Sequence, residues 1–232
     1  RKQEIVAFYS EFVAPSFHDL PTDLGLSPKW QSLTQLAQNS TDFQALSGHQ
    51  CQFLNDTDAM IAAMVADIEL AKRSVVLMFY IIDPKGEVEK LLLALEQASL
   101  RGVRCEILAD GVGSAQFFST AWCARLKKSG VLIHQSLAIG LLKAVLVRSD
   151  LRNHRKLLVV DEQVAYTGSF NLVDPKMFKQ GAGVGQWVDV MLRIQGPVVI
   201  QLLAMFYADV AVENKQHFAD IQVLWREHWP HV

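Results

Sequence analysis

Apolar and polar positions alternate along the chain in blocks that predict strands and helices in turn. Nearly unbroken apolar runs predict strands that are buried on both faces. Apolar residues at helical spacing predict a helix that is capped by Thr57 or Asp58. One face of this helix carries Met60, Ile61, Met64, Val65 and Ile68. The pattern predicts strands at residues 51–54, 74–82, 103–109, 131–134, 157–160, 163–167 and 187–194, and further helices at 86–101, after 114 to about 129, and 197 to about 213.

Helices that alternate with apolar strands are typical of an α/β sandwich. The run at residues 74–82 is apolar enough to lie at the centre of its sheet. Residues 1–48 instead predict a helical N-terminal preface, with helices at 1–13 and 30–38. We therefore expect two parts, the preface at residues 1–48 and an α/β domain at residues 49–232.

Composition and charge narrow the functional classes. The 232 residues have a net charge of −2, so the chain lacks the basic excess typical of proteins that bind nucleic acid. Three scattered cysteines are too few for a disulfide framework or a zinc site and favour a reducing, cytoplasmic setting. Charged residues interrupt the apolar runs at 137–147 and 197–212, and both fall short of a membrane span.

One stretch gathers the polar side chains that phosphorus chemistry needs. It follows the pattern H-x-K-x4-D-x6-G-S-x-N, from His154 and Lys156 through Asp161 to Ser169 and Asn171. Side chains two residues apart on a strand share a face, so His154 and Lys156 are expected to project together. A neutral imidazole is nucleophilic at neutral pH and can form a covalent phosphoryl intermediate. Lys156, Ser169 and Asn171 would bind the oxygens of the phosphoryl group.

Two carboxylates are candidates for supporting roles. The attacking imidazole needs an acceptor at its other nitrogen, and Asp189 is the candidate for it. We count Asp189 with Ser169 and Asn171 among the substrate-binding residues. Asp161 lies in the turn between the strands predicted at 157–160 and 163–167. It either belongs to the catalytic set or holds the hairpin through backbone hydrogen bonds.

The motif resembles the signature of the phospholipase D superfamily, and its neighbourhood resembles the bacterial cardiolipin synthases. The likeness extends from about residue 50 to about residue 213. It rests on the motif and on the segments Phe79-Tyr80-Ile81, Asp110-Gly111-Val112-Gly113-Ser114, Asn171-Leu172-Val173-Asp174-Pro175 and Gly183-Val184-Gly185-Gln186-Trp187.

The resemblance implies a fold and a reaction. The fold is a phospholipase D-like three-layer α-β-α sandwich around a mixed, largely buried sheet, in which two similar halves share one site. The reaction joins two phosphatidylglycerol molecules and releases glycerol through a phosphohistidine intermediate, with no metal or other cofactor. His154, Lys156 and Asp161 are then the catalytic residues, and His154 is the nucleophile.

The resemblance also implies partners and a location. The partners are an anionic phospholipid, phosphatidylglycerol, and a membrane surface, and nucleic acid is not among them. The location is the bacterial inner (cytoplasmic) membrane, with a soluble catalytic domain that faces the cytoplasm.

The sequence departs from the family pattern in two respects. No second H-x-K motif occurs in it, and it shows no membrane-spanning segment, although the family usually carries one or two. We therefore expect residues 49–232 to be the first catalytic half, with the second motif supplied in cis or by a homodimer partner. Two other functions stay open. One is a homodimeric phospholipase D-like phosphodiesterase or nuclease, and the other is a lipid-binding half-domain that is inactive without its second motif.

Two loops also have alternative interpretations. The loop Gly111-Val112-Gly113-Ser114 precedes a predicted helix and is either a plain connector or a phosphate cradle. Residues 137–152 interleave apolar residues with Lys143, Arg148 and Arg152. They form either a lipid-contact loop or a segment that covers the core.

Overall fold

The computed structural model describes residues 10, 24–41, 43–136, 153–183 and 185–213. The chain divides into two compact units, of which the first takes in Arg1–Gln50 and Gln195–Val232 and the second Cys51–Ile194. Apart from Ser10, the helix predicted at 1–13 lies outside the described residues, and so does the loop predicted at 137–152. The functional division into residues 1–48 and 49–232 stays a prediction.

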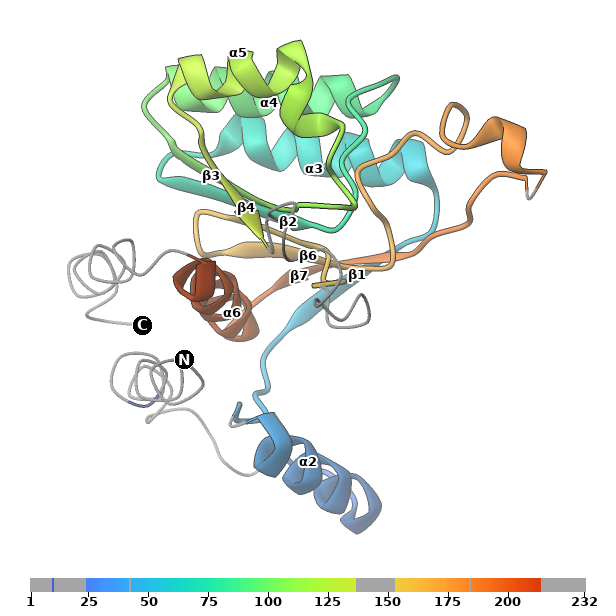
Figure 1. Ribbon diagram of the computed structural model, residues 1–232. Helices are drawn as coiled ribbons and strands as arrows, with labels where there is room; N and C mark the ends of the chain where they lie inside the picture. Colours follow the sequence, from blue (N-terminus) through green and yellow to red (C-terminus); the bar gives the residue numbers. More distant parts are fainter. Residues whose placement is uncertain (1–9, 11–23, 42, 137–152, 184, 214–232) are drawn as a thin grey trace, which may run out of the picture. The chain divides into compact units, whose positions relative to one another are not determined.

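A seven-stranded sheet is the framework of the fold (Figure 1). Its strands are β1 (Gln50–Leu54), β2 (Ser74–Phe79), β3 (Arg104–Asp110), β4 (Leu132–Ser136), β5 (Leu157–Val160), β6 (Val164–Gly168) and β7 (Met191–Gln195). Their order in the sheet is β1-β7-β6-β5-β2-β3-β4. Strand β3 runs parallel to β2 and β4, whereas β5 runs antiparallel to β2 and β6. The sheet is therefore mixed, and the predicted α/β class is confirmed.

The helices of the second unit cover one face of this sheet (Figure 1). They are α3 (Thr57–Leu70), α4 (Val88–Leu100) and α5 (Ala121–Ser129), with a short 3-10 helix at Phe117–Ser119. A second 3-10 helix, Gln180–Ala182, belongs to the connection between β6 and β7. Helix α3 is capped one residue earlier than predicted, because the Asp56 carboxylate accepts a hydrogen bond from the Ala59 N–H at 2.8 Å. Helix α5 is capped in the same way by Thr120.

The core lies between these helices and the sheet. All six residues of β2 are buried, which agrees with an interior position between β3 and β5. The predicted apolar face of α3 packs here through Met60, Ile61, Met64 and Ile68, with Val65 partly buried. Burial on this scale is the main stabilising contribution to a domain of this size.

Two strand boundaries differ from the prediction. Strand β2 ends at Phe79 rather than at residue 82, because the next backbone groups bond to side chains outside the sheet. The Ile81 N–H donates to Asn171 Oδ1 at 3.1 Å, and the Ile82 N–H donates to Ser114 Oγ at 3.0 Å. Strand β7 begins at Met191 rather than at residue 187.

The first unit contains helices α2 (Pro28–Thr41) and α6 (Val198–Glu213). A hydrogen bond of 2.8 Å from Gln201 Nε2 to the Gln44 carbonyl ties α6 to the segment that follows α2. Among the helices that the structure describes, none combines the length and the apolar character needed to cross a bilayer.

Candidate active site

The motif residues meet at one edge of the sheet because of the strand directions. The parallel strands β2 and β3 end at this edge, and the antiparallel strand β5 begins there. His154 and Lys156 directly precede β5, and Ser169 and Asn171 follow β6. Tyr80, the residue after β2, lies among them.

His154 lies against the Tyr80 ring. The two ring centroids are 4.3 Å apart and the planes are tilted by 35°. The backbone next to His154 is held by Asn153, whose Nδ2 lies 3.0 Å from Met78 Sδ and whose Oδ1 accepts from the Arg155 N–H at 3.0 Å. His154 is exposed, so its imidazole is accessible to a substrate from solvent.

Lys156 is held next to His154 and Tyr80. Its ammonium donates to the His154 carbonyl at 2.5 Å and lies 5.8 Å from the centre of the Tyr80 ring. Burial lowers the pKa of Lys156, because desolvation penalises the charged form, and the negative charge of Asp189 raises it in part. Lys156 is thus bonded to the backbone of His154, and the Asp189 carboxylate lies near enough to act on its charge.

Asp189 contacts Ser169. The Ser169 hydroxyl donates to Asp189 Oδ1 at 2.6 Å and accepts from the Val190 N–H at 3.1 Å. Both functions of the hydroxyl are thus occupied, and Ser169 would have to exchange a partner before it donates to a phosphate. The second oxygen, Asp189 Oδ2, is buried and has no hydrogen-bond partner among the described residues. The hydrogen bond expected between Asp189 and His154 is not present in the described part of the chain.

Asn171 is buried and holds the segment after β2. Its Oδ1 accepts from Ile81, next to Tyr80, and the Ile81 carbonyl accepts in turn from the Leu172 N–H at 3.1 Å. Asn171 is 7% exposed, and no described residue accepts a hydrogen bond from its Nδ2 amide group. Asn171 therefore joins the His154 group through the backbone next to Tyr80.

Asp161 lies at the opposite end of β5 from His154 and Lys156. The four residues of β5 lie between Lys156 and Asp161, and the five steps along the chain span about 16 Å at the usual rise. The Asp161 carboxylate accepts from the backbone N–H groups of Lys72, Arg73 and Ser74 at 2.7–2.9 Å. Of the two roles considered for Asp161, this geometry supports the structural one, a clamp between the β5–β6 turn and the start of β2.

Tyr80 was part of the family resemblance but received no role from the sequence. The structure gives it contacts with both His154 and Lys156. The Gly111–Ser114 loop holds the backbone of Tyr80, because the Ser114 hydroxyl donates to the Tyr80 carbonyl at 3.0 Å. A Cβ on Gly113 would stand 2.3 Å from that same carbonyl oxygen. Only glycine fits at Gly113 without displacing Tyr80.

The same loop does not form a phosphate cradle. The N–H groups of Val112 and Gly113 both donate to Asp110 Oδ1 at 2.8 Å. Backbone donors that are already bonded to a carboxylate are not free to bind an anion. The connector interpretation of the loop is therefore favoured, with the added function of supporting Tyr80.

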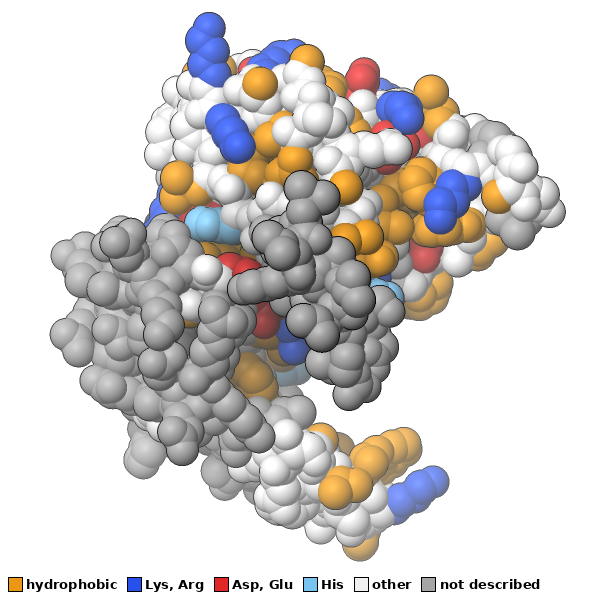
Figure 2. Space-filling model, viewed as in Figure 1, with side chains coloured by type: hydrophobic (Ala, Val, Ile, Leu, Met, Phe, Trp, Pro, Cys, Tyr) orange, Lys and Arg blue, Asp and Glu red, His pale blue; other side chains and the backbone are white. Residues whose placement is uncertain are grey.

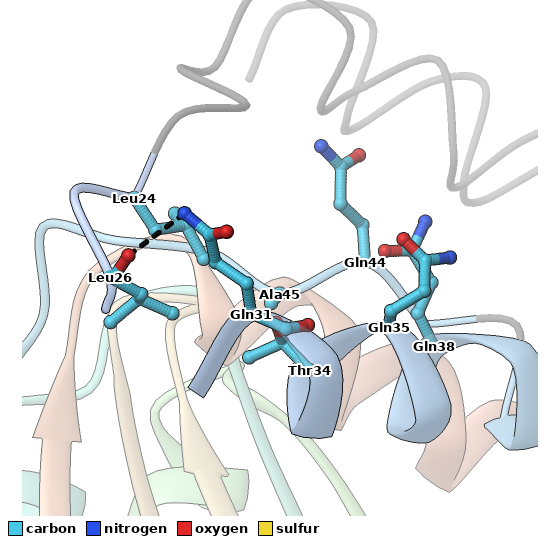
Figure 3. A pocket seen from close by; sticks show the side chains of 8 residues that line it. All are labelled: Leu24, Leu26, Gln31, Thr34, Gln35, Gln38, Gln44 and Ala45. Carbon is cyan, nitrogen blue, oxygen red and sulfur yellow. Dashed lines mark hydrogen bonds between the residues drawn. The ribbon is translucent and has the colours of Figure 1, made fainter. Parts of the chain in front are cut away.

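A pocket of about 330 Å³ lies in the first unit, away from the motif in the sequence (Figure 3). Its walls carry uncharged side chains: Leu24, Leu26, Gln31, Thr34, Gln35, Gln38, Gln44 and Ala45. It offers no titratable group for acid–base chemistry. Among the described residues, no cluster of His, Cys, Asp or Glu side chains has the arrangement of a metal site.

Comparison with solved structures identifies the class of fold. A phospholipase D family member, Nuc from Salmonella typhimurium, aligns with a TM-score of 0.52 over 72% of this chain and 96% of its own. The sequences are 19% identical, so this likeness concerns the fold. The mixed sheet with its motif at one edge is thus a phospholipase D-like α/β fold.

Sequence comparison identifies the family within that class. The family model described as "Cardiolipin synthase, PLD-like domain" matches residues 64–225, and the chain belongs to this family. It is 43% identical over 184 residues to cardiolipin synthase A of Erwinia tasmaniensis and 39% identical over 183 residues to that of Escherichia fergusonii. Each alignment covers 79% of this chain and 38% of the relative, so the chain spans well under half the length of these relatives.

Proposed function

We propose that this chain carries the nucleophilic half of a cardiolipin synthase-type phosphatidyltransferase site. The observation that supports this most is the packing of the exposed His154 imidazole against the Tyr80 ring, over which the Lys156 ammonium also lies, at the edge that Asn171 shares. This set combines a nucleophile, a cation and a hydrogen-bond donor, as phosphoryl transfer requires.

The proposed reaction has two displacements. A nitrogen of the His154 imidazole attacks the phosphorus of phosphatidylglycerol, the P–O bond to the headgroup glycerol breaks, and glycerol leaves with a proton. A hydroxyl of a second phosphatidylglycerol then attacks the phosphohistidine and gives up its proton, the P–N bond breaks, and cardiolipin and free His154 result. The acid and base for these protons belong to the second motif, supplied in cis or by a homodimer partner.

The other residues act on the charges that develop. Lys156 and Asn171 bind the equatorial oxygens of the phosphoryl group, whose negative charge increases in the transition state. Asp189 Oδ2 is the acceptor proposed for the imidazole N–H, because it is the buried carboxylate oxygen that still lacks a partner among the described residues. Asp161 contributes through the fold rather than by contact with phosphorus.

The proposed substrate sets the location. Phosphatidylglycerol resides in a membrane, so the site must work at an anionic membrane surface, proposed to be the cytoplasmic face of the bacterial inner membrane. The partners are then phosphatidylglycerol, that surface and the second catalytic half.

A chimera tests the proposal. The matching segment of the Erwinia tasmaniensis cardiolipin synthase A is replaced by this chain, and labelled phosphatidylglycerol is followed to its products. We expect cardiolipin from the chimera and none from its His154→Asn variant. Phosphatidate as the only product would indicate a phospholipase. A folded chimera with no more activity than the His154→Asn variant would refute the proposal.

A further inference from the structure

Between β6 and β7 the chain forms an extension, here called the arm, at residues 175–188. The arm is drawn in orange in Figure 1 and extends away from the helices and the sheet of the second unit. Both of its ends are anchored. Asp174 is buried, and its carboxylate accepts from the N–H groups of Glu87 and Lys176 at 3.1 and 2.9 Å. At the other end, Asp189 bonds to Ser169 of the proposed active site.

The described part of the arm exposes apolar side chains. Met177 is 52% exposed, and Val188, at 90%, is the most exposed of the large hydrophobic residues described. Phe178 and Trp187 pack edge to face at 5.0 Å and brace the two limbs of the arm against each other. In the view of Figure 2, hydrophobic side chains lie next to a cationic one in this region. Exposed apolar side chains on an anchored extension indicate a surface that binds a membrane or another molecule.

The charge on the arm has one sign. Residues 175–188 contain two lysines and no acidic residue. The Lys176 ammonium pairs with Asp58 at 2.8 Å. The Lys179 ammonium has no acidic partner in the described part of the chain, and it lies 5.3 Å from the Phe178 ring and 5.8 Å from the Trp187 ring. The arm therefore presents one uncompensated cation next to its exposed apolar groups.

The backbone at Lys179 has an unusual conformation. Lys179 has a φ of 48°, the left-handed region that residues with a Cβ seldom adopt. The contacts with the Phe178 and Trp187 rings place the Lys179 ammonium on the arm.

We propose that the arm is a membrane-docking element that inserts into the surface of an anionic phospholipid bilayer. Met177, Trp187 and Val188 would enter the boundary of the acyl chains, and Lys179 would remain at the level of the phosphates. Anionic lipid suits this surface because a bilayer satisfies the apolar groups and the cation together. The inference rests on the proposed function for its choice of partner: docking through the arm brings a lipid headgroup to the edge where Asp189 meets Ser169.

Vesicle flotation tests the inference, with vesicles of phosphatidylcholine alone or mixed in equal parts with phosphatidylglycerol. The double variant Met177→Glu, Val188→Glu and the variant Lys179→Glu should each bind the mixed vesicles at least about tenfold more weakly. Leu70→Glu and Leu100→Glu are matched controls, because these leucines are 74% and 63% exposed elsewhere in the second unit. Both controls should bind like the unchanged protein. Urea unfolding midpoints show that every variant is folded.

A fluorescent probe locates the contact. An environment-sensitive dye on Val188→Cys, in a Cys51→Ser background, should shift to shorter wavelength on mixed vesicles, whereas the same dye on Leu100→Cys should not. No shift at position 188, or no vesicle binding by the unchanged protein, overturns the inference. A shift that depends on protein concentration and not on vesicles also overturns it, because a second copy then covers the arm.

Binding needs no turnover, so the docking inference and the catalytic proposal can fail separately. His154→Asn should bind mixed vesicles as tightly as the unchanged protein. If His154→Asn binds normally and the arm variants do not, the docking inference holds whatever the outcome of the transfer assays.

Discussion

Tyr80 holds two groups of the proposed site at once. Its ring lies against the His154 imidazole, and the same ring faces the Lys156 ammonium. An exposed imidazole on a short loop has several rotamers available, and a packed ring reduces their number. We therefore regard Tyr80 as a positioning residue, which acts through His154 rather than on the substrate.

Replacing Tyr80 tests this role. Tyr80→Leu should lower kcat for transfer by about ten- to a hundredfold with little change in KM, because misplacement of a reacting group affects the chemical step. Tyr80→Phe keeps the ring and should restore most of the rate. Steady-state kinetics on the chimera measures both. Equal losses in the Leu and Phe variants would assign the role to the phenol hydroxyl instead of the ring.

Lys156 gives the transfer reaction its expected dependence on pH. Burial lowers the pKa of Lys156, so its ammonium loses the proton at a lower pH than an ordinary lysine does. Since the charged form binds the phosphoryl oxygens, the rate should fall as pH rises through that lowered pKa. Asp189→Asn removes the negative charge that raises the pKa of Lys156, so the alkaline fall should move to still lower pH. Rate profiles that coincide for the two proteins would contradict this assignment.

In the β5–β6 hairpin, the residues proposed for catalysis precede β5, and the residue that stabilises the fold follows it. His154 and Lys156 precede β5, and Asp161 follows it. In the turn, Asp161 and Glu162 have φ values of 50° and 59°, and the Gln163 N–H donates to the Val160 carbonyl at 3.0 Å. These are the features of a type I′ turn, which suits the twist of a hairpin. The Asp161 carboxylate attaches this turn to the segment before β2.

Asp161→Ala should therefore destabilise the fold. It leaves three backbone N–H groups without their charged acceptor, and we expect a loss of about 3 kcal/mol in the free energy of unfolding. Gln163→Ala changes an exposed side chain in the same turn and is the matched control, with an expected change within about 0.5 kcal/mol. Urea denaturation measures both. A stable Asp161→Ala protein that has lost transfer activity would instead support a catalytic role.

Element positions were more predictable than element ends. An unbroken apolar run such as β2 predicts a strand covered on both faces, because no other environment buries every side chain. Its end did not follow from the pattern. Ile81 and Ile82 are apolar, yet their N–H groups bond to Asn171 and Ser114, which come from distant parts of the sequence.

The site shows the same limit. The spacing of His154, Lys156, Ser169 and Asn171 predicted that they would lie at one edge. It did not predict that Ser169 would bond to Asp189, because that contact depends on how β7 approaches the end of β6. Contacts across the sheet depend on tertiary packing, so they cannot be predicted from a local sequence pattern.

The three cysteines of the second unit differ in burial, so their reactivity tests whether its core is closed to solvent. Cys105 and Cys123 are buried and Cys51 is exposed. Burial raises the pKa of Cys105 to about 12, so at neutral pH this thiol is protonated as well as inaccessible. We expect a maleimide to label Cys51 alone in the native protein and all three cysteines in urea. Native labelling of Cys105 would show that the sheet opens without global unfolding.

At the scale of the whole molecule, the chain provides one motif at one sheet edge, and the proposed reaction needs a proton donor from a second half. The nucleophile is the part of that account that belongs to this chain alone. The most direct test is to stop turnover of phosphorus-labelled phosphatidylglycerol with denaturant at neutral pH, digest the protein and locate the label. The account predicts label on the peptide that contains His154, and none in the His154→Asn variant. Turnover without label on that peptide would contradict it.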